Sequence, residues 1–148
     1  MAAIQILMIE DTDGDARLAE LAFREMDFKY SLLHLNCGIK AISHLRAAEE
    51  HQIPHVILID VNMHKATGCM VAETLRTIEK LENVFIIMTS TGDCGLIENC
   101  CSQIGANAFL YKSMDFETYF LNLKNILSAN GYLDPTGVNS KYARHPPR

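Results

Sequence analysis

Four apolar runs in this chain each end at side chains suited to holding a cation or a phosphoryl group. They end at Glu10-Asp11, at Asp60, at Thr89-Ser90-Thr91 and at Lys112. Apolar runs of four or five residues, each followed by a helical pattern, are typical of buried strands in a parallel sheet. Because ligands bind outside the carboxyl ends of such strands, we expect one rim of the sheet to collect acidic groups, a hydroxyl and an ammonium.

The acidic residues of this predicted rim could bind magnesium and accept a phosphoryl group. Mg²⁺ prefers oxygen ligands and takes one or two carboxylates, which suits Asp11 and Asp60, with Glu10 acting directly or through a water. Asp60 alone ends the central strand, so it is the candidate for a carboxylate nucleophile. A transferred phosphoryl group could then place its oxygens on the cation, the Ser90 hydroxyl and the Lys112 ammonium.

Strand and helix patterns alternate five times along the sequence. Right-handed crossovers between such units give an α/β doubly wound sheet, and we predict a flavodoxin-like (βα)5 fold with five parallel strands in the order 2-1-3-4-5. That order places the four strands with polar ends side by side. The expected strands are Ile4–Ile9, Tyr30–Leu35, His55–Ile59, Val84–Met88 and Ala108–Tyr111. The expected helices are Asp13–Met26, Ile39–Glu50, Cys69–Leu81, Leu96–Ile104 and Asp115–Ala129.

Length and composition limit the classes of protein that this chain can be. Its 148 residues fit one domain, and 49% apolar with 21% charged residues is an ordinary globular composition. A net charge of -5 argues against non-specific binding to nucleic acid or to an anionic membrane. No apolar stretch approaches the roughly 20 residues that cross a bilayer. Five cysteines without zinc-site spacing, and no recognisable signal peptide, lead us to expect a cytoplasmic protein with reduced thiols.

The polar residues and their spacing resemble the receiver domains of two-component response regulators, over about Ile4–Leu127. The matching positions are Glu10-Asp11, Asp60 with Val61-Asn62-Met63 after it, Ser90 and Lys112. From Asp60 to Ser90 the spacing is 30 residues, and from Ser90 to Lys112 it is 22. A slip of one residue would exchange Ser90 for Thr89 or Thr91, and the two spacings together favour Ser90.

The resemblance implies a signalling module rather than an enzyme. In such a module a sensor histidine kinase donates a phosphoryl group to the aspartate that matches Asp60. The Mg²⁺ ligands that the resemblance implies are Glu10, Asp11, Asp60 and the backbone carbonyl of Asn62. Ser90 and Lys112 would bind the phosphate. Ser90 and Phe109 would form the switch, with the aromatic ring changing rotamer on activation.

Two positions depart from the family pattern. Where the family usually has proline, this chain has His64 in the loop beyond Asp60 and Ser113 after Lys112. Without proline, a cis Lys112–Ser113 bond would cost about 2.5–4 kcal/mol, which leaves the geometry of that loop open. His64 borders the expected site. The Lys112-Ser113 pair and a C-terminal tail too short for a DNA-binding domain resemble the short regulators that partner bacterial phytochromes.

Two other functions fit part of the pattern. Asp11-Thr12-Asp13 after the first strand is similar to the nucleophile motif of haloacid-dehalogenase-type phosphatases, with Asp11 as nucleophile and Asp13 as general acid. That interpretation leaves Asp60 unused and lacks a downstream acidic pair for its metal. The second alternative is a receiver-fold interaction module without phosphotransfer, which the two missing prolines keep open.

The last predicted helix carries more apolar side chains than one buried stripe requires. We expect a receiver domain over residues 1–130 and a tail over residues 131–148 that forms a homodimer interface together with this helix. Tyr132 and Leu133 would extend its apolar surface, and an identical subunit is the commonest partner for an exposed apolar patch. The alternative is that part of this surface lies under the tail of the same chain.

Overall fold

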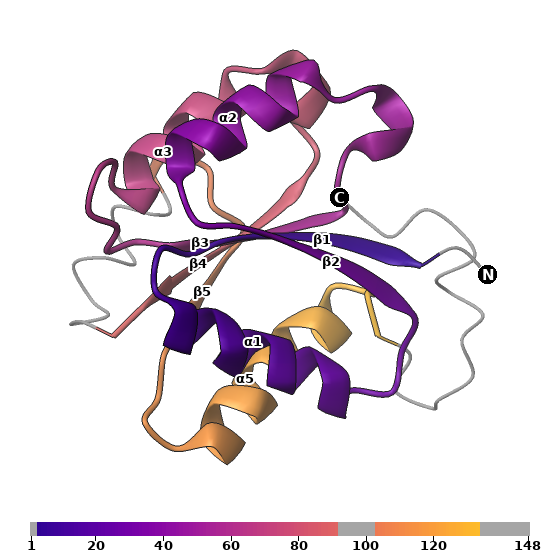
Figure 1. Ribbon diagram of the computed structural model, residues 1–148. Coiled ribbons are helices and arrows are strands. Elements are labelled where there is room, and N and C mark those ends of the chain that lie inside the picture. Colours follow the sequence, from indigo (N-terminus) through magenta and orange to yellow (C-terminus); the bar gives the residue numbers. More distant parts are fainter. Residues whose placement is uncertain (1–2, 92–102, 134–148) are drawn as a thin grey trace.

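Five parallel strands form one sheet in the computed structural model, which describes residues 3–91 and 103–133 (Figure 1). The strand order is β2-β1-β3-β4-β5, and each neighbouring pair is parallel. The strands are β1 (Ile4–Ile9), β2 (Tyr30–Leu35), β3 (Val56–Asp60), β4 (Phe85–Ser90) and β5 (Ala108–Tyr111). The predicted flavodoxin-like sheet and its order are confirmed.

Four helices in the described residues cover the two faces of this sheet. α1 (Asp13–Glu25) and α5 (Phe116–Ala129) lie on one face, and α2 (Gly38–Ala47) and α3 (Gly68–Arg76) lie on the other (Figure 1). The predicted helix Leu96–Ile104 lies outside the described residues except for its last two positions. Nowhere in the described ranges is there a helix long and apolar enough to span a membrane.

Each face of the sheet has its own apolar core, built from alternate residues of the same strands. Met8 and Leu58 pack on the side of α1 and α5, whereas Ile9 and Ile59 pack on the side of α2 and α3. Successive side chains of a strand point to opposite faces. A strand between two helical layers is therefore apolar at every position, which is why the sequence shows continuous apolar runs.

The prediction that the helix after β3 continues to Leu81 is wrong, because α3 ends at Arg76. The Thr77 hydroxyl donates to the carbonyl of Thr74, with 2.6 Å between the oxygens. The Arg76 guanidinium donates to the carbonyls of Leu81 and Val84, among others. These side-chain hydrogen bonds replace the helical pattern and turn the chain towards β4.

The prediction that the second helix reaches Glu50 is also wrong, because α2 ends at Ala47. The Lys80 ammonium reaches across from the 3-10 helix Glu79–Leu81, which follows α3, and donates to the carbonyls of Arg46 and Ala48, at 2.8 and 2.6 Å. A lysine in this place satisfies carbonyls that the end of a helix leaves unpaired.

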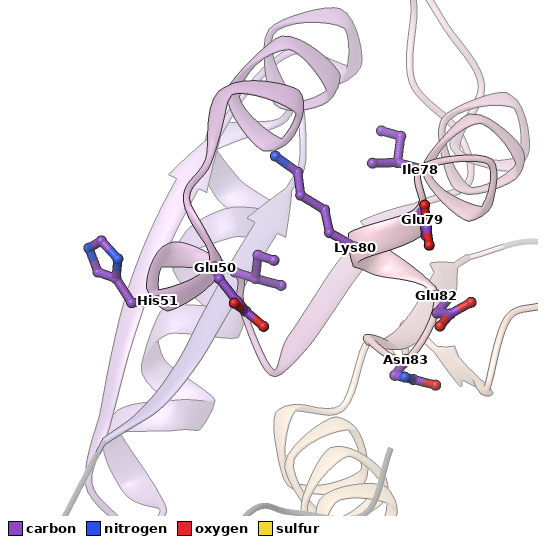
Figure 2. A pocket seen from close by; sticks show the side chains of 8 residues that line it. Glu50, His51, Ile78, Glu79, Lys80, Glu82 and Asn83 are labelled. Carbon is purple, nitrogen blue, oxygen red and sulfur yellow. The ribbon is translucent and has the colours of Figure 1, made fainter.

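An open pocket of about 1180 Å³ lies beside Lys80, between the 3-10 helices Glu50–Gln52 and Glu79–Leu81. Figure 2 shows the side chains that line it. It is lined by Glu50, His51, Ile53, Ile78, Glu79, Lys80, Glu82 and Asn83. The two short helices precede β3 and β4, so the pocket lies at the amino ends of these strands. It is therefore remote from the predicted rim at the carboxyl ends.

The chain after α5 returns to the core of its own molecule. Gly131 has a positive φ of 82°, and the N–H of Tyr132 donates to the carbonyl of Leu127 at 2.9 Å, as in helix ends where glycine reverses the chain. Tyr132 is fully buried against Phe85, with ring centroids 5.4 Å apart, and Leu133 is buried too. The prediction that Tyr132 and Leu133 extend an exposed apolar surface is wrong. The rest of the tail, 134–148, lies outside the described residues.

Candidate functional site

Three carboxylates meet at the carboxyl ends of β1 and β3. One oxygen from each of Glu10, Asp11 and Asp60 lies within 4.8 Å of the others. The two strands are neighbours, with Ile9 beside Ile59, so the acids that end them come together. Glu10 and Asp60 are buried and Asp11 is partly buried. Crowded carboxylates repel one another, and their oxygens are the ligands that a hard divalent cation prefers.

Lys112 reaches the same rim from the end of β5. Its Nζ lies 2.5 Å from Glu10 Oε1, 3.0 Å from Asp15 Oδ2 and 3.2 Å from Asp60 Oδ1. The backbone N–H of Lys112 donates to the carbonyl of Ser90 at 2.8 Å, which continues the pairing of β5 with β4. The side chain is only 8% exposed. Lys112 is thus a buried cation whose charge is balanced by carboxylates from three separate segments.

Burial and charge act in opposite directions on the pKa values of this cluster. Burial raises the pKa of Glu10 to about 7, even though the hydrogen bond from Lys112 lowers it, and the nearby Asp60 adds to the rise. Burial would lower the pKa of Lys112, but the hydrogen bond and charge of Glu10 and the charge of Asp60 outweigh it. The pKa of Lys112 is therefore raised, and the ammonium stays charged at every physiological pH.

Ser90 is linked to Asp60 through the side chain and backbone of Asn62. The Asn62 side-chain amide donates to Ser90 Oγ at 3.2 Å, and its backbone N–H donates to Asp60 Oδ1 at 3.2 Å. Ser90 is fully buried at the end of β4. Of the flanking residues, Thr89 directs its hydroxyl to a β3 carbonyl at 3.5 Å, and Thr91 is exposed. Ser90 therefore stays our prediction for the hydroxyl that binds phosphate.

His64, which stands where the family usually has proline, fastens the β3–α3 loop to Asp11. Its backbone N–H donates to Asp11 Oδ2 at 2.9 Å, and its Nδ1 lies 2.7 Å from the same oxygen. Burial would raise the pKa of Asp11, but these hydrogen bonds outweigh it and lower the pKa. The same interaction raises the pKa of the exposed His64. Both contacts are made to Oδ2 of Asp11, so they fix that oxygen and leave Oδ1 outside the interaction with His64.

Two further residues shape the rim without having been predicted from the sequence. Gly68 begins α3 so close to Asp60 that a Cβ atom would lie 2.1 Å from the Asp60 carbonyl oxygen, so only glycine fits there. Asp15 contacts Lys112 from the first turn of α1. The sequence could have predicted the position of Asp15, because an acid in the first turn of the helix after β1 lies near the carboxyl end of that strand.

Phe109 lies on β5 beside Met88 of β4. It is partly buried and packs against the apolar core below α2 and α3. The Lys112–Ser113 bond is trans, since no cis peptide bond occurs in the described part of the chain. The structure thus places Phe109 three residues before Lys112 on an edge strand, with its ring between core and surface.

The sheet order and the acidic group at its carboxyl edge define a doubly wound α/β protein with an acidic edge that could hold a cation. Over residues 6–124 the sequence matches the response regulator receiver domain, so the chain belongs to that family. Receiver domains bind Mg²⁺ or Mn²⁺ at an acidic site, and the oxygens of Glu10, Asp11 and Asp60 fit such a cation.

Several relatives share the sequence pattern or the fold. The probable methanogenesis regulatory protein FilR2 of Methanothrix harundinacea is 29% identical over 116 residues, which are 76% of this chain and 74% of FilR2. The phosphorylated cyanobacterial phytochrome response regulator RcpA has a TM-score of 0.76 at 23% identity, covering 86% of this chain and 93% of RcpA. The Mn²⁺-bound form of response regulator Rcp1, a Synechocystis protein, has a TM-score of 0.73 at 24% identity, covering 84% of this chain and 91% of Rcp1.

The raised pKa of Glu10 predicts that the protein without divalent cations loses stability as the pH rises from about 4.5 to 7. The unfolded chain has the ordinary Glu pKa of 4.5 and the folded protein a pKa of about 7. The folded state therefore binds more protons in this window, and stability falls with rising pH. Lys112 stays charged throughout, and the lowered pKa of Asp11 acts only below its ordinary value of 3.8.

Urea unfolding in EDTA measures this effect across the window. The free energy of unfolding should fall more steeply in the wild type than in Glu10→Gln, which cannot ionise. Added Mg²⁺ should restore stability to the wild type near pH 7, because a cation favours the ionised carboxylates. Parallel pH profiles for the two proteins would contradict the role given to Glu10.

Proposed function

We propose that this protein is a response regulator in which Asp60 accepts a phosphoryl group from a sensor histidine kinase in the presence of Mg²⁺. The observation that carries the proposal is the position of the Asp60 carboxylate. It is buried at the end of the central strand, within the acidic group and 3.2 Å from Lys112. The similarity to RcpA, a phytochrome response regulator, supports a bacterial phytochrome as the kinase.

The proposed reaction is a phosphoryl transfer between two protein side chains. A carboxylate oxygen of Asp60 attacks the phosphorus of a phosphohistidine, a new P–O bond forms, and the P–N bond breaks with its electron pair going to the imidazole nitrogen. Lys112 and Ser90 donate hydrogen bonds to phosphoryl oxygens. When bound, Mg²⁺ supplies positive charge to the phosphoryl oxygens. The residues that would hold it are Glu10, Asp11, Asp60 and the carbonyl of Asn62.

The site geometry speaks against the phosphatase alternative. Asp11, its nucleophile, has one oxygen engaged by two donors of His64. Asp13, its general acid, is exposed on the first turn of α1. The buried acids next to the Lys112 ammonium are Glu10 and Asp60, and neither belongs to the phosphatase motif. An interaction module without phosphotransfer would need none of the acidic group, Ser90 or Lys112, and all of them are in place.

We also expect the protein to work in the cytoplasm.

Asp60→Asn should abolish phosphorylation, because the amide that replaces the carboxylate is a far weaker nucleophile. The protein is incubated with acetyl phosphate and Mg²⁺, and intact mass and peptide mapping locate the modified residue. Asp13→Asn removes a nearby exposed acid and should be labelled like the wild type. Label that persists in Asp60→Asn would refute the assignment, and label on Asp11 would favour the phosphatase. Chelating Mg²⁺ should prevent labelling of the wild type.

We propose that the switch couples Ser90 to Phe109. A phosphoryl oxygen would draw the Ser90 hydroxyl away from Asn62, and the Phe109 ring, now half-buried, would move into the vacated space. A local change of charge would thereby bias a two-state element. The face that would change comprises the predicted fourth helix, β5 and α5, and this face would bind the downstream partner.

Amide chemical shifts test this switch when beryllofluoride, a stable phosphoryl mimic, is added with Mg²⁺. We expect shifts at residues 103–111, on both sides of Phe109, and little change in β2 at the far edge of the sheet. Phe109→Ala should leave beryllofluoride binding intact but reduce these shifts. If residues near Phe109 do not respond in the wild type, the switch is built differently.

We propose a homodimer through the exposed side of α5. Leu121 is 46% exposed, and Phe116 and Phe120 are only partly buried, with ring centroids 6.1 Å apart. Tyr132 and Leu133, which we predicted as part of this surface, are buried and do not contribute to it. We still propose that tail residues 134–148 take part in the interface.

Sedimentation at micromolar concentration measures the dimer. Leu121→Lys should weaken it, because a charge replaces an exposed apolar side chain at the proposed interface. Leu33→Lys makes the same change on β2, at the opposite edge of the sheet, and should not. A monomer both with and without phosphorylation would rule the dimer out.

A further inference from the structure

Lys112 has a third acidic partner that the cation site and the phosphoryl acceptor do not explain. Its Nζ contacts Asp15 at 3.0 Å, in addition to Glu10 and Asp60. A lysine ammonium has three N–H donors, and three carboxylates surround this one. Two of these donors are used in hydrogen bonds to Glu10 and Asp15, and Asp60 is an ion-pair partner. A phosphoryl oxygen that approaches Nζ therefore competes with the carboxylates already around it.

Asp15 is the carboxylate that can give up Lys112 at the lowest cost. Its side chain is 39% exposed, whereas those of Glu10 and Asp60 are 5% exposed each. Water can solvate the ionised Asp15 after the lysine leaves, but a buried carboxylate that loses its cation stays without solvation. Glu10 and Asp60 also belong to the acidic group that fits a divalent cation, and Asp15 is not a member of that group in the described residues.

The packing around Lys112 leaves little room for any other rearrangement. The space bordered by Glu10, Asp15, Asp60 and Lys112 contains a cavity of only about 10 Å³, which Tyr119 of α5 helps to close. The ammonium cannot retreat into the protein to make room for a phosphoryl oxygen. An exchange of partners at Nζ, with Asp15 on the solvent side, is the move that the geometry allows.

We propose that Asp15 is a positioning residue that holds Lys112 in the resting protein and competes with the phosphoryl group for it. This inference rests on the proposed function, in which Lys112 binds phosphate. On phosphorylation of Asp60, a phosphoryl oxygen replaces the Asp15 carboxylate as the third partner of Lys112. The displaced carboxylate also repels the phosphoryl oxygens. Asp15 therefore weakens the hold of the site on a phosphoryl group and favours the resting state.

The test compares Asp15→Asn with Asp13→Asn, which removes the same charge from the same helical turn at an exposed position. Beryllofluoride, formed from beryllium chloride and sodium fluoride with Mg²⁺, is titrated while amide chemical shifts are followed. We expect Asp15→Asn to bind it roughly three- to tenfold more tightly than the wild type, since a partly exposed ion pair is lost from the competing resting state. Asp13→Asn should bind beryllofluoride within about twofold of the wild type, because salt screens the effect of an exposed charge on the site.

Further variants separate competition from a purely structural role. Asp15→Glu keeps the carboxylate and should bind beryllofluoride nearly as the wild type does. Asp15→Ala removes it without adding an amide and should bind more tightly, like Asp15→Asn, which keeps the test valid if one variant does not fold. Urea unfolding confirms that the variants compared are folded. A residue that only fastened α1 to the rim would give variants with lower stability and equal or weaker binding.

The outcomes distinguish this inference from the proposed function. If the wild type binds beryllofluoride but Asp15→Asn and Asp15→Ala bind no more tightly than Asp13→Asn, the role of Asp15 is overturned and the proposed function stands. If the wild type neither binds beryllofluoride nor is phosphorylated at Asp60, the proposed function fails, and this inference fails with it. Tighter binding confined to the Asp15 variants that lack the carboxylate supports the competition.

Discussion

Lys112 is held by buried carboxylates at the end of β5, and the rest of the rim is arranged around this cation. Removing an ammonium and two carboxylates from water costs several kcal/mol per ion unless their mutual attraction compensates for it. The contacts of Lys112 with Glu10 and Asp60 provide that attraction, but the rim still carries an excess of negative charge. Asp11 and Asp15 add to that excess. In the proposed reaction a phosphoryl group would bring more negative charge, so a divalent cation would have to enter before or with it. The pKa of Glu10 is raised mainly by burial, and the nearby charge of Asp60 adds to the rise.

The parallel sheet provides the geometry that these charges need. All five strands run in one direction, so the ends of β1, β3, β4 and β5 open on the same edge, towards the left of Figure 1. The order 2-1-3-4-5 follows from right-handed crossovers, and it places β3 in the middle. Asp60 therefore has a strand on either side, with Thr89 of β4 at its own level in the register. Both faces of the sheet are covered by helices, which bury the apolar side chains of the strands. The close approach of Gly68 to the Asp60 carbonyl fixes where α3 begins relative to this centre.

Sequence patterns predicted the sheet and the members of the rim because both depend on strongly periodic features. A strand buried on two faces has to be apolar throughout, and a polar residue directly after it has to lie at the edge. Helix ends were predicted less well, because side-chain contacts from distant segments decide them. Lys80 ends α2 and Arg76 helps to end α3 through hydrogen bonds with carbonyls outside their own helices. The burial of Tyr132 was missed for a similar reason. Its apolar ring is compatible with an interface or with a core, and only the turn at Gly131 directs it to Phe85.

Two residues at the periphery of the rim, His64 and Asp15, contact residues at its centre. His64 makes two hydrogen bonds to Asp11, so the β3–α3 loop is fixed by polar contacts, one of them from a backbone N–H that a proline would lack. Asp15 adds a partner to Lys112 from α1. Neither residue carries the proposed chemistry, yet each contacts one that does. Both are also more exposed than the groups that they hold. Exposed residues can change without disturbing the buried core, whereas exchanging Asp60 or Lys112 would leave a buried charge unpaired. In the proposed function, the periphery of the rim is therefore where the strength of cation and phosphoryl binding could be adjusted independently of the fold.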